Sequence, residues 1–219
     1  MTLSPFTAAI FDMDGTLADN MPLHYEAFRQ FMQRYDLQPP PAEIAAGLTG
    51  KRNREILPVL FGYPLSDGEI QQYSAEKEQI YHQLIAGLRP LPGLHQLLDI
   101  LDTRGVPTAI ATSAPGGNVP PMLDQLGVTG RFRVVTLGEE VAHGKPAPDI
   151  FLEAARRLGA DPATCLVFED AYAGIEAAHA AGMQCVALAT THTHDQLRRL
   201  GPAAIITDYE DFLPLLPSM

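Results

Sequence analysis

The chain has 219 residues, of which 46% are hydrophobic and 19% charged, and its formal net charge is −11. This length and hydrophobic content predict one large folded domain, or a core with a smaller insert, and exclude a disordered chain. The acidic balance disfavours nucleic-acid and anionic-membrane surfaces, which need clustered lysine and arginine, but local positive groups or a metal could still hold an anionic small substrate.

The N-terminus carries no basic region followed by an apolar stretch, and no apolar run approaches the roughly 18 residues needed to span a bilayer. We therefore expect a cytoplasmic protein without a signal peptide. The two cysteines, Cys165 and Cys185, stand in apolar runs with no metal-binding spacing. They are expected to be packing residues, as suits a reducing compartment.

The first predicted element is a buried strand over Thr7–Phe11, which is followed directly by Asp12-Met13-Asp14-Gly15-Thr16. Two carboxylates this close repel each other unless a cation or a shared proton intervenes. A carboxylate held by Mg²⁺ beside an anionic substrate is a workable nucleophile for phosphoryl transfer, and the second carboxylate could act as acid and base. Taken alone, such a pair is more often a solvated acidic turn at the end of a strand.

The next segment, about residues 21–88, contains no good strand. Its helical stretches are broken at Pro39-Pro40-Pro41, at Gly47–Gly50 and at Gly62-Tyr63-Pro64. A helical insert directly after a first strand predicts a cap over the mouth of a sheet. We expect residues 19–88 to form this cap, and residues 1–18 and 89–219 to form the core.

Short apolar strands and helices alternate through the rest of the chain. The predicted strands are Val106–Ala111, Arg133–Leu137, Cys165–Phe168, Cys185–Ala189 and Ala203–Thr207. The predicted helices are Gly93–Arg104, Val119–Leu126, Pro148–Leu158, Gly174–Ala181 and His194–Leu200. This alternation predicts an α/β fold with a doubly wound, Rossmann-like parallel sheet and a small α-helical cap.

Polar residues recur where these strands end. Thr112-Ser113-Ala114 could cradle a phosphate, Lys145 stands in a turn before a helix, and Glu169-Asp170 is a second acidic pair. Each feature alone has an ordinary explanation, as a turn, a surface lysine or a charged helix N-terminus. Because open parallel sheets bind ligands at the carboxyl ends of their strands, the features together predict a phosphoryl-transfer site whose oxygen ligands suit Mg²⁺.

The set of motifs resembles the haloacid dehalogenase superfamily, in its branch with a helical cap after the first strand. The matching pieces are Asp12–Thr16, Thr112-Ser113, Gly144–Phe151 and Phe168–Ile175. The resemblance implies that Asp12 is the nucleophile that forms an aspartyl-phosphate. It also implies that Asp14 is the general acid and base. Dehalogenase members lack an acid at that second position, so a phosphatase or phosphomutase is favoured.

The resemblance assigns the other roles as follows. Thr112 donates a hydrogen bond to the phosphoryl group, and Lys145 links the nucleophile to the phosphate. Asp170 is a Mg²⁺ ligand, and Glu169 is either a ligand or a partner of one. Asp12 and the Asp14 backbone carbonyl complete the metal site. Thr16, Ser113 and Ala114 are expected beside the substrate. In the cap, His24 and Lys77 resemble residues of the beta-phosphoglucomutase group and of related sugar-phosphate phosphatases, and Gly50 and Arg52 are also expected to contact the substrate.

The cap also departs from this pattern. Thr49 and Asn53 stand where the mutases carry a lysine and an arginine, although Lys51, Arg52 or Arg54 could take their place. A mutase must hold a second phosphate in the cap, whereas a phosphatase need only admit water. We therefore expect a Mg²⁺-dependent phosphatase of a small phosphorylated metabolite, such as a sugar phosphate, with a beta-phosphoglucomutase-type enzyme as the alternative.

Two further alternatives are less favoured. Related pyrophosphatases share a stretch like Asn20–His24 but place a glutamate where Ala46 stands here. A non-catalytic binding protein would be expected to lose one of the motif acids, and none is missing. We expect neither nucleic acid nor a membrane as partner, and we expect a monomer because the cap must move.

Overall fold

The computed structural model describes residues 3–216, so the outermost residues of the predicted core, 1–2 and 217–219, lie outside the described residues. Within the described part, six parallel strands form one sheet in the order β3-β2-β1-β4-β5-β6. The strands are β1 (Ala8–Phe11), β2 (Thr108–Thr112), β3 (Val134–Leu137), β4 (Cys165–Glu169), β5 (Gln184–Leu188) and β6 (Ala204–Ile206). The predicted doubly wound α/β fold is confirmed.

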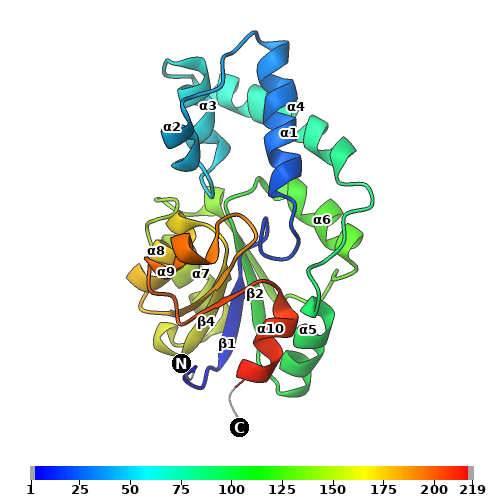
Figure 1. Cartoon of the computed structure of the whole chain (residues 1–219), viewed down its shortest axis with the longest axis vertical. Helices are drawn as coiled ribbons and strands as arrows, with labels where there is room; N and C mark the ends of the chain where they lie inside the picture. Colours follow the sequence, from blue (N-terminus) through cyan, green and yellow to red (C-terminus); the bar gives the residue numbers. More distant parts are fainter. Residues whose placement is uncertain (1–2, 217–219) are drawn as a thin grey trace.

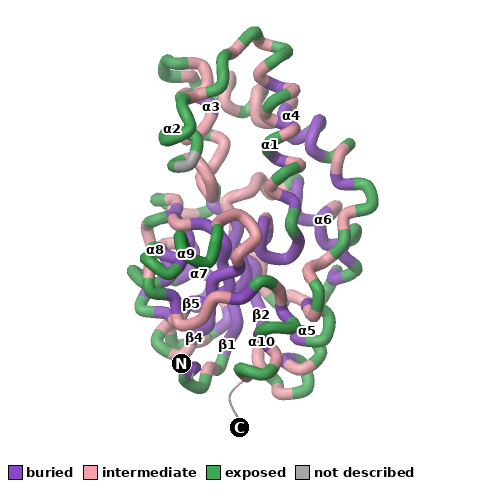
Figure 2. The backbone as a smooth tube through the Cα atoms, viewed as in Figure 1, coloured by how far each residue is buried: buried purple, intermediate pink, exposed green. Residues whose placement is uncertain are grey.

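Helices cover both faces of this sheet, so alternate residues along each strand enter different cores. Ala9 and Phe11 pack with α5, α6 and α10, whereas Ala8 and Ile10 pack with α7, α8 and α9. These helices are α5 (Leu94–Thr103), α6 (Val119–Leu126), α7 (Asp149–Leu158), α8 (Tyr172–Ala180), α9 (His194–Arg198) and α10 (Tyr209–Phe212). The central strands are therefore buried on both sides, which explains their continuous apolar sequences (Figure 2).

The strand order reverses between β1 and β4, and in doubly wound sheets ligands bind beside such a reversal. The chain runs from β1 outward to β2 and β3, then returns to place β4 on the other side of β1. Phe11 pairs with Phe168 in the register, and the Asp12 N–H donates to the Phe168 carbonyl at 3.0 Å. The carboxyl ends of β1 and β4 thus lie side by side, at the position where doubly wound sheets bind ligands.

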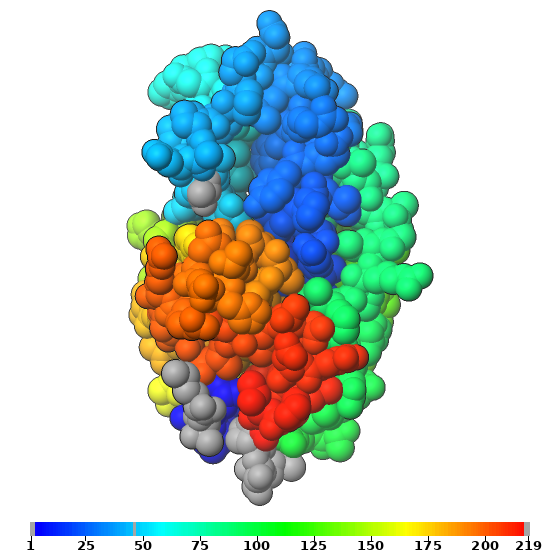
Figure 3. Space-filling model, viewed as in Figure 1, coloured from blue at the N-terminus to red at the C-terminus, as the bar shows by residue number. Residues whose placement is uncertain are grey.

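Four further helices form a separate layer above this edge of the sheet (Figure 1). They are α1 (Met21–Arg34), α2 (Ala42–Ala46), α3 (Asn53–Phe61) and α4 (Asp67–Leu84). They enclose an apolar cluster of their own that includes Phe31, Leu57 and Ile80. The chain enters this helical segment after β1 and leaves it before α5, and the Leu91 N–H donates to the Leu17 carbonyl where the two connections meet. In the space-filling view the segment forms the blue and cyan upper part of the molecule (Figure 3).

Two helix predictions are wrong in detail. Helix α8 begins at Tyr172, two residues before the predicted start at Gly174, because this glycine lies inside the helix where the helix passes close to Glu169. The short helix α10, which Asp208 caps through its side chain, was not predicted. No helix in the described part of the chain is long and apolar enough to cross a bilayer.

Candidate active site

Residues from four predicted motifs meet at the carboxyl edge of the sheet. Asp12 follows β1, Thr112 ends β2, Glu169 ends β4, and Lys145 comes from the loop between β3 and α7. Asp12, Thr112 and Glu169 line a cavity of about 270 Å³ between the sheet edge and the helical segment. The walls of this cavity include Asp12, Asp14, Thr112, Glu169 and Asp170.

Lys145 joins two of the carboxylates. Its Nζ lies 2.6 Å from Asp12 Oδ1 and 2.6 Å from Glu169 Oε1, and it also donates to the Ala111 carbonyl at 3.3 Å. The side chain is only 1% exposed, so this ammonium has no water to replace its partners. Burial alone would lower the pKa of Lys145, but the charges of Asp12 and Glu169 outweigh burial and raise it. Lys145 therefore stays charged and fixes the orientation of Asp12.

Asp12, Glu169 and Asp170 form a buried acidic cluster, with one carboxylate oxygen from each within 4.8 Å of the others. Burial raises the pKa of Asp12 to about 8 despite the Lys145 charge, and burial together with Glu169 and Asp12 raises that of Asp170 well above its usual value. When ionised, the three carboxylates carry more negative charge than one ammonium offsets, which contributes to the raised pKa values of Asp12 and Asp170. An oxygen-only set of ligands with this excess fits a hard divalent cation.

The surrounding chain holds this cluster in place by close packing. A Cβ atom added at Gly174 would lie 1.7 Å from Glu169 Oε1, and one added at Gly15 would lie 2.1 Å from Asp170 Oδ2. The Thr191 hydroxyl, from the loop after β5, donates to Asp170 Oδ2, and Thr16 Oγ1 donates to Asp170 Oδ1 at 3.4 Å. Both glycines are therefore needed for the backbone to approach the carboxylates.

The Asp14 side chain points away from the acidic cluster towards the helical segment. Asn20 Nδ2 donates to Asp14 Oδ1 at 2.6 Å, and His24 Nε2 lies 3.1 Å from the same oxygen without the alignment of a hydrogen bond. Burial would raise the pKa of Asp14, but the charge of His24 and the contacts with His24 and Asn20 lower it overall. Its predicted metal contact was through the backbone carbonyl, and that contact stays a prediction.

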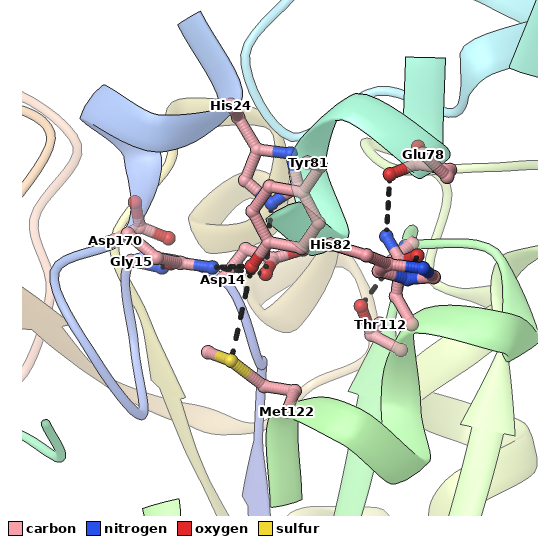
Figure 4. Close-up of polar contacts among 12 residues, drawn as sticks. Asp14, Gly15, His24, Glu78, Tyr81, His82, Thr112, Met122 and Asp170 are labelled. Atoms are coloured by element: carbon pink, nitrogen blue, oxygen red, sulfur yellow. Dashed lines mark hydrogen bonds and ion pairs between the residues drawn. The ribbon is translucent and has the colours of Figure 1, made fainter. Parts of the chain in front are cut away.

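A chain of side-chain contacts continues from Asp14 into α4. His24 Nδ1 lies 2.8 Å from Lys77 Nζ, and Lys77 Nζ lies 3.1 and 3.2 Å from the two Glu78 oxygens. The Tyr81 ring stacks on the His24 ring at a centroid distance of 3.8 Å (Figure 4). The structure thus brings both predicted cap residues, His24 and Lys77, to Asp14.

Glu78 links this chain of contacts back to the sheet domain. Its Oε1 accepts a hydrogen bond from Asn53 Nδ2, and its Oε2 accepts one from Asn118 Nδ2, each at 2.8 Å. Asn118 ends the short turn η1 (Gly116–Asn118) after β2, and its Oδ1 lies 2.8 Å from His82 Nε2. Glu78 is labelled at the upper right of Figure 4.

The remaining predicted substrate contacts divide into two groups. Gly50, Ser113 and Ala114 line the cavity, and Thr112 Oγ1 accepts a hydrogen bond from the Ala114 N–H at 3.0 Å. Thr16 is fully buried behind Asp170. Arg52 faces a neighbouring cleft, where it donates to Glu55 at 2.9 Å and to the Gly138 carbonyl at 3.2 Å. The structure does not bring Thr16 and Arg52 into the cavity.

Sequence reasoning missed several residues at the site, namely Asn20, Glu78, Asn118 and Thr191. Asn20 offered one signal, because it stands just before α1 in the manner of a helix cap, although its side chain bonds Asp14 instead. Thr191 follows a strand end, as the other site residues do. Glu78 and Asn118 carry no local signal, because their partners lie far away in the sequence.

Comparison with known proteins agrees with this geometry. The family model of the haloacid dehalogenase-like hydrolases matches residues 9–188. The chain is 35% identical to a fructose-1-phosphate phosphatase of Escherichia coli over 83% of its own length and 95% of the relative's. It is 34% identical to the beta-phosphoglucomutase of Bacillus subtilis, over 82% of this chain and 81% of that enzyme.

The solved structure of a family IA haloacid dehalogenase hydrolase from Entamoeba histolytica superposes with a TM-score of 0.83 at 28% identity. The match covers 95% of this chain and 98% of that one. The family model, the relatives and the solved structure all point to one family. The chain belongs to the haloacid dehalogenase-like hydrolases.

Proposed function

We propose that the protein is a Mg²⁺-dependent phosphatase of small phosphorylated metabolites, such as sugar phosphates. The observation that carries the proposal is the placement of Lys145 between Asp12 and Glu169, with Asp170 beside them and a cavity in front. This arrangement orients one carboxylate as a nucleophile while leaving an excess of acid for a divalent cation. The phosphatase named among the relatives supports the same conclusion.

The proposed reaction has two steps. A carboxylate oxygen of Asp12 attacks the phosphorus, the ester bond breaks, and Asp14 gives its proton to the departing alcohol oxygen. Asp14 then takes a proton from water, which attacks the phosphorus of the aspartyl-phosphate and releases phosphate and free Asp12. Mg²⁺ held by Asp12, Glu169 and Asp170 would neutralise charge on the phosphoryl oxygens. Lys145 keeps Asp12 aligned throughout.

The environment of Asp14 suits both halves of this cycle. Its lowered pKa in the present arrangement favours the ionised form that accepts a proton from water. An incoming phosphate dianion adds negative charge nearby and shifts this pKa upward, which favours the protonated form needed for the first step. Thr112, Ser113 and Ala114 are proposed to hold the phosphoryl oxygens at the end of β2.

We propose that residues 19–88 act as a cap over a core of residues 1–18 and 89–219. His24, Lys77 and Gly50 from this segment line the cavity together with Asp12 and Asp170 from the sheet. Closure of the cap would exclude water during the first step, and opening would admit it for the second. A monomer is sufficient for this cycle, because one chain supplies every residue named.

The alternative is a phosphomutase of the beta-phosphoglucomutase type, which the Bacillus subtilis relative supports. Both reactions share the attack by Asp12. They differ in the group that accepts the phosphoryl from it, which is water in one case and a second sugar hydroxyl in the other.

The test is phosphate release from sugar phosphates, phosphoglycolate, nucleotides and pyrophosphate, with and without Mg²⁺. Release that needs Mg²⁺ and falls at least about 10³-fold in Asp12→Asn is the expected result, because the nucleophile is lost. Interconversion of glucose 1-phosphate and glucose 6-phosphate with an added bisphosphate, without net release of phosphate, would establish the mutase instead. Metal-independent release would contradict the proposed site.

A further inference from the structure

The cavity beside Asp12 carries many carboxylates and few cations. Among the described residues that line it, the acids are Asp12, Asp14, Glu78, Glu169 and Asp170, and the only ammonium groups are those of Lys51 and Lys77. A bound divalent cation and Lys145 would offset the acids at the sheet edge. When Asp12, Glu169 and Asp170 are ionised, their three negative charges equal the three positive charges of the cation and Lys145, so the sheet edge has no surplus of positive charge for a second phosphate.

Among the described residues, Lys77 is the one lysine or arginine that the helical segment points towards Asp14, and Glu78 neutralises it. The two residues are neighbours on α4, and their side chains are only 2% and 9% exposed. Burial lowers the pKa of Lys77 and the charge of Glu78 raises it, and the pKa ends below its usual value. Hydrogen bonds from Asn53 and Asn118 hold the Glu78 carboxylate in place from two sides.

The other cations near the cavity are also engaged. Lys51 Nζ donates to the backbone carbonyl of Lys145 at 2.8 Å. Arg52 is paired with Glu55 and faces the neighbouring cleft, and Arg54 lies 3.0 Å from Asp67 in the same cleft. Among the described residues that line the cavity, Lys51 keeps an ammonium that no acid pairs, but a second phosphate beside α4 would meet the Glu78 carboxylate and a Lys77 that Glu78 already neutralises. That is a costly way to remove a dianion from water.

We propose that Glu78 is a specificity-determining residue that restricts this site to esters carrying one phosphate and an uncharged leaving group. It does so by occupying Lys77 and by repelling a second phosphate. The proposal rests on the phosphatase function above and deepens it, because it names the substrate class that the cap admits. It also gives a physical reason why this chain would not hold the bisphosphate that a mutase needs.

The remaining wall of the cavity fits such a leaving group. Apolar side chains from α1 and α3 make up much of it, including Met21, Phe28, Ile56 and Leu60. Its volume of about 270 Å³ is just below the range of roughly 300–1,000 Å³ that is usual for ligand pockets, so it suits a small ligand. A compact polyol or sugar would use the few polar groups at the sheet edge and pack its carbon skeleton on this wall.

The test compares fructose 1-phosphate with fructose 1,6-bisphosphate, which differ by the second phosphate alone. Binding is measured by calorimetry in the presence of Mg²⁺ on Asp12→Asn, which cannot turn the ligands over. We expect the monophosphate to bind at least about tenfold tighter, corresponding to about 1.4 kcal/mol. Adding Glu78→Gln should shift the affinity ratio at least about tenfold towards the bisphosphate, because it removes a charge and frees Lys77.

Glu76→Gln is the matched control, because it removes the same charge from α4 at a residue that contacts Tyr35 and Gln72, away from the cavity. It should leave the affinity ratio unchanged. Equal affinity of Asp12→Asn for both ligands, or an unchanged ratio after Glu78→Gln, would overturn the inference.

Turnover of fructose 1-phosphate by the wild-type enzyme separates the two proposals. Selective binding of the monophosphate without turnover of any phosphate ester would sink the phosphatase function and leave the role of Glu78 intact. Turnover of fructose 1-phosphate without discrimination against the bisphosphate would support the phosphatase function and overturn the role of Glu78. If neither sugar phosphate binds, the inference about Glu78 is wrong, and phosphate release from the wider panel of esters still decides the phosphatase function.

Discussion

At the scale of single residues, Lys145 supplies the positive charge that partly offsets the acidic cluster of Asp12, Glu169 and Asp170. Its ammonium is the buried positive charge in contact with Asp12 and Glu169, and the pKa values of Asp12 and Asp170 remain raised even with it present. Without it, Asp12, Glu169 and Asp170 would face one another without a compensating charge. Removing one partner of a buried charge pair costs about 3–5 kcal/mol, because the other partner stays buried and unpaired.

Lys145→Met should therefore lower the free energy of unfolding by about 3–5 kcal/mol in the absence of a divalent cation. Addition of Mg²⁺ should recover part of this loss, because the cation binds the same carboxylates in the folded state. Urea unfolding with and without Mg²⁺ measures both effects. Lys51→Met, which loses a single hydrogen bond to a backbone carbonyl, is the control. Equal losses in the two variants would show that Lys145 does not stabilise the cluster.

Glu78 makes a second residue-scale prediction, which concerns pH. Burial would raise its pKa, but the charge of Lys77 and the hydrogen bond from Asn118 lower it overall below the usual value of 4.5. A carboxyl whose pKa is lower in the folded state contributes stability above its unfolded pKa, and loses that contribution as pH falls through the folded value. The stabilising effect of Glu78 should therefore be full at neutral pH and fade below about pH 4.5.

The difference in unfolding free energy between the wild type and Glu78→Gln measures this effect across pH. It should be large near pH 7 and approach zero in acid. Glu43→Gln, at an exposed position in α2, should show no such trend. A difference that is constant from pH 7 into the acid range would mean that Glu78 acts through packing alone.

At the scale of secondary-structure elements, the approach of α8 to β4 determines the position of a predicted metal ligand. Gly174 lies in the first turn of α8, against the Glu169 carboxylate at the end of β4. Glu169 Oε2 also accepts the Ala171 N–H at 2.7 Å, so the carboxylate is held between the strand and the start of the helix. A side chain at Gly174 must push this carboxylate away from Lys145 and from the acidic cluster.

Gly174→Ala should therefore weaken Mg²⁺ binding by about 10–100-fold, as is usual when the groups that orient a metal ligand are disturbed. Calorimetric titration with Mg²⁺ alone tests this without relying on catalysis. Gly68→Ala is the control, because a Cβ atom there meets nothing within 4 Å. Unchanged affinity in Gly174→Ala would mean that Glu169 is not part of the metal site.

Sequence reasoning predicted the elements well where their signals are local. Apolar runs such as that of β1, and the polar residues that end them, are contiguous in the chain, so the sheet and its motifs could be predicted. The start of α8 could not, because Gly174 looks like a helix boundary unless the nearby Glu169 carboxylate is known. The hydrogen bonds of Thr191 to Asp170 and of Asn118 to Glu78 depend on the packing of segments that are remote in sequence, and neither residue type announces such a partner.

At the scale of the whole molecule, Asn118 couples the helical segment to the sheet domain. It donates to Glu78 and lies within hydrogen-bond distance of His82, so two residues of α4 meet one side chain after β2. Asn118→Ala would leave the buried Glu78 Oε2 without this donor, at a cost of about 1–3 kcal/mol. Because this hydrogen bond joins the helical segment to the sheet domain, its loss should let the helical segment separate from the sheet domain more often.

In limited proteolysis, we expect Asn118→Ala to be cleaved faster than the wild type. The cleavage should fall at the connections near residues 19–20 and 86–92. Asn53→Ala removes a hydrogen bond to the same carboxylate from within the helical segment, and it should leave this cleavage rate unchanged. Equal acceleration in the two variants would assign the effect to general destabilisation.

The central position of β4 has a consequence for the order in which the protein can become active during its synthesis. β1 pairs with β2 on one side and with β4 on the other, and β4 is made only after the helical segment, β2 and β3. The helical segment has an apolar cluster of its own and can collapse early on the ribosome. Asp12 is among the first residues to emerge, but its partners Lys145, Glu169 and Asp170 are synthesised much later. With Asp12 as the nucleophile that we propose, a nascent chain could not hydrolyse phosphate esters before the strand that completes the centre of its sheet has been translated.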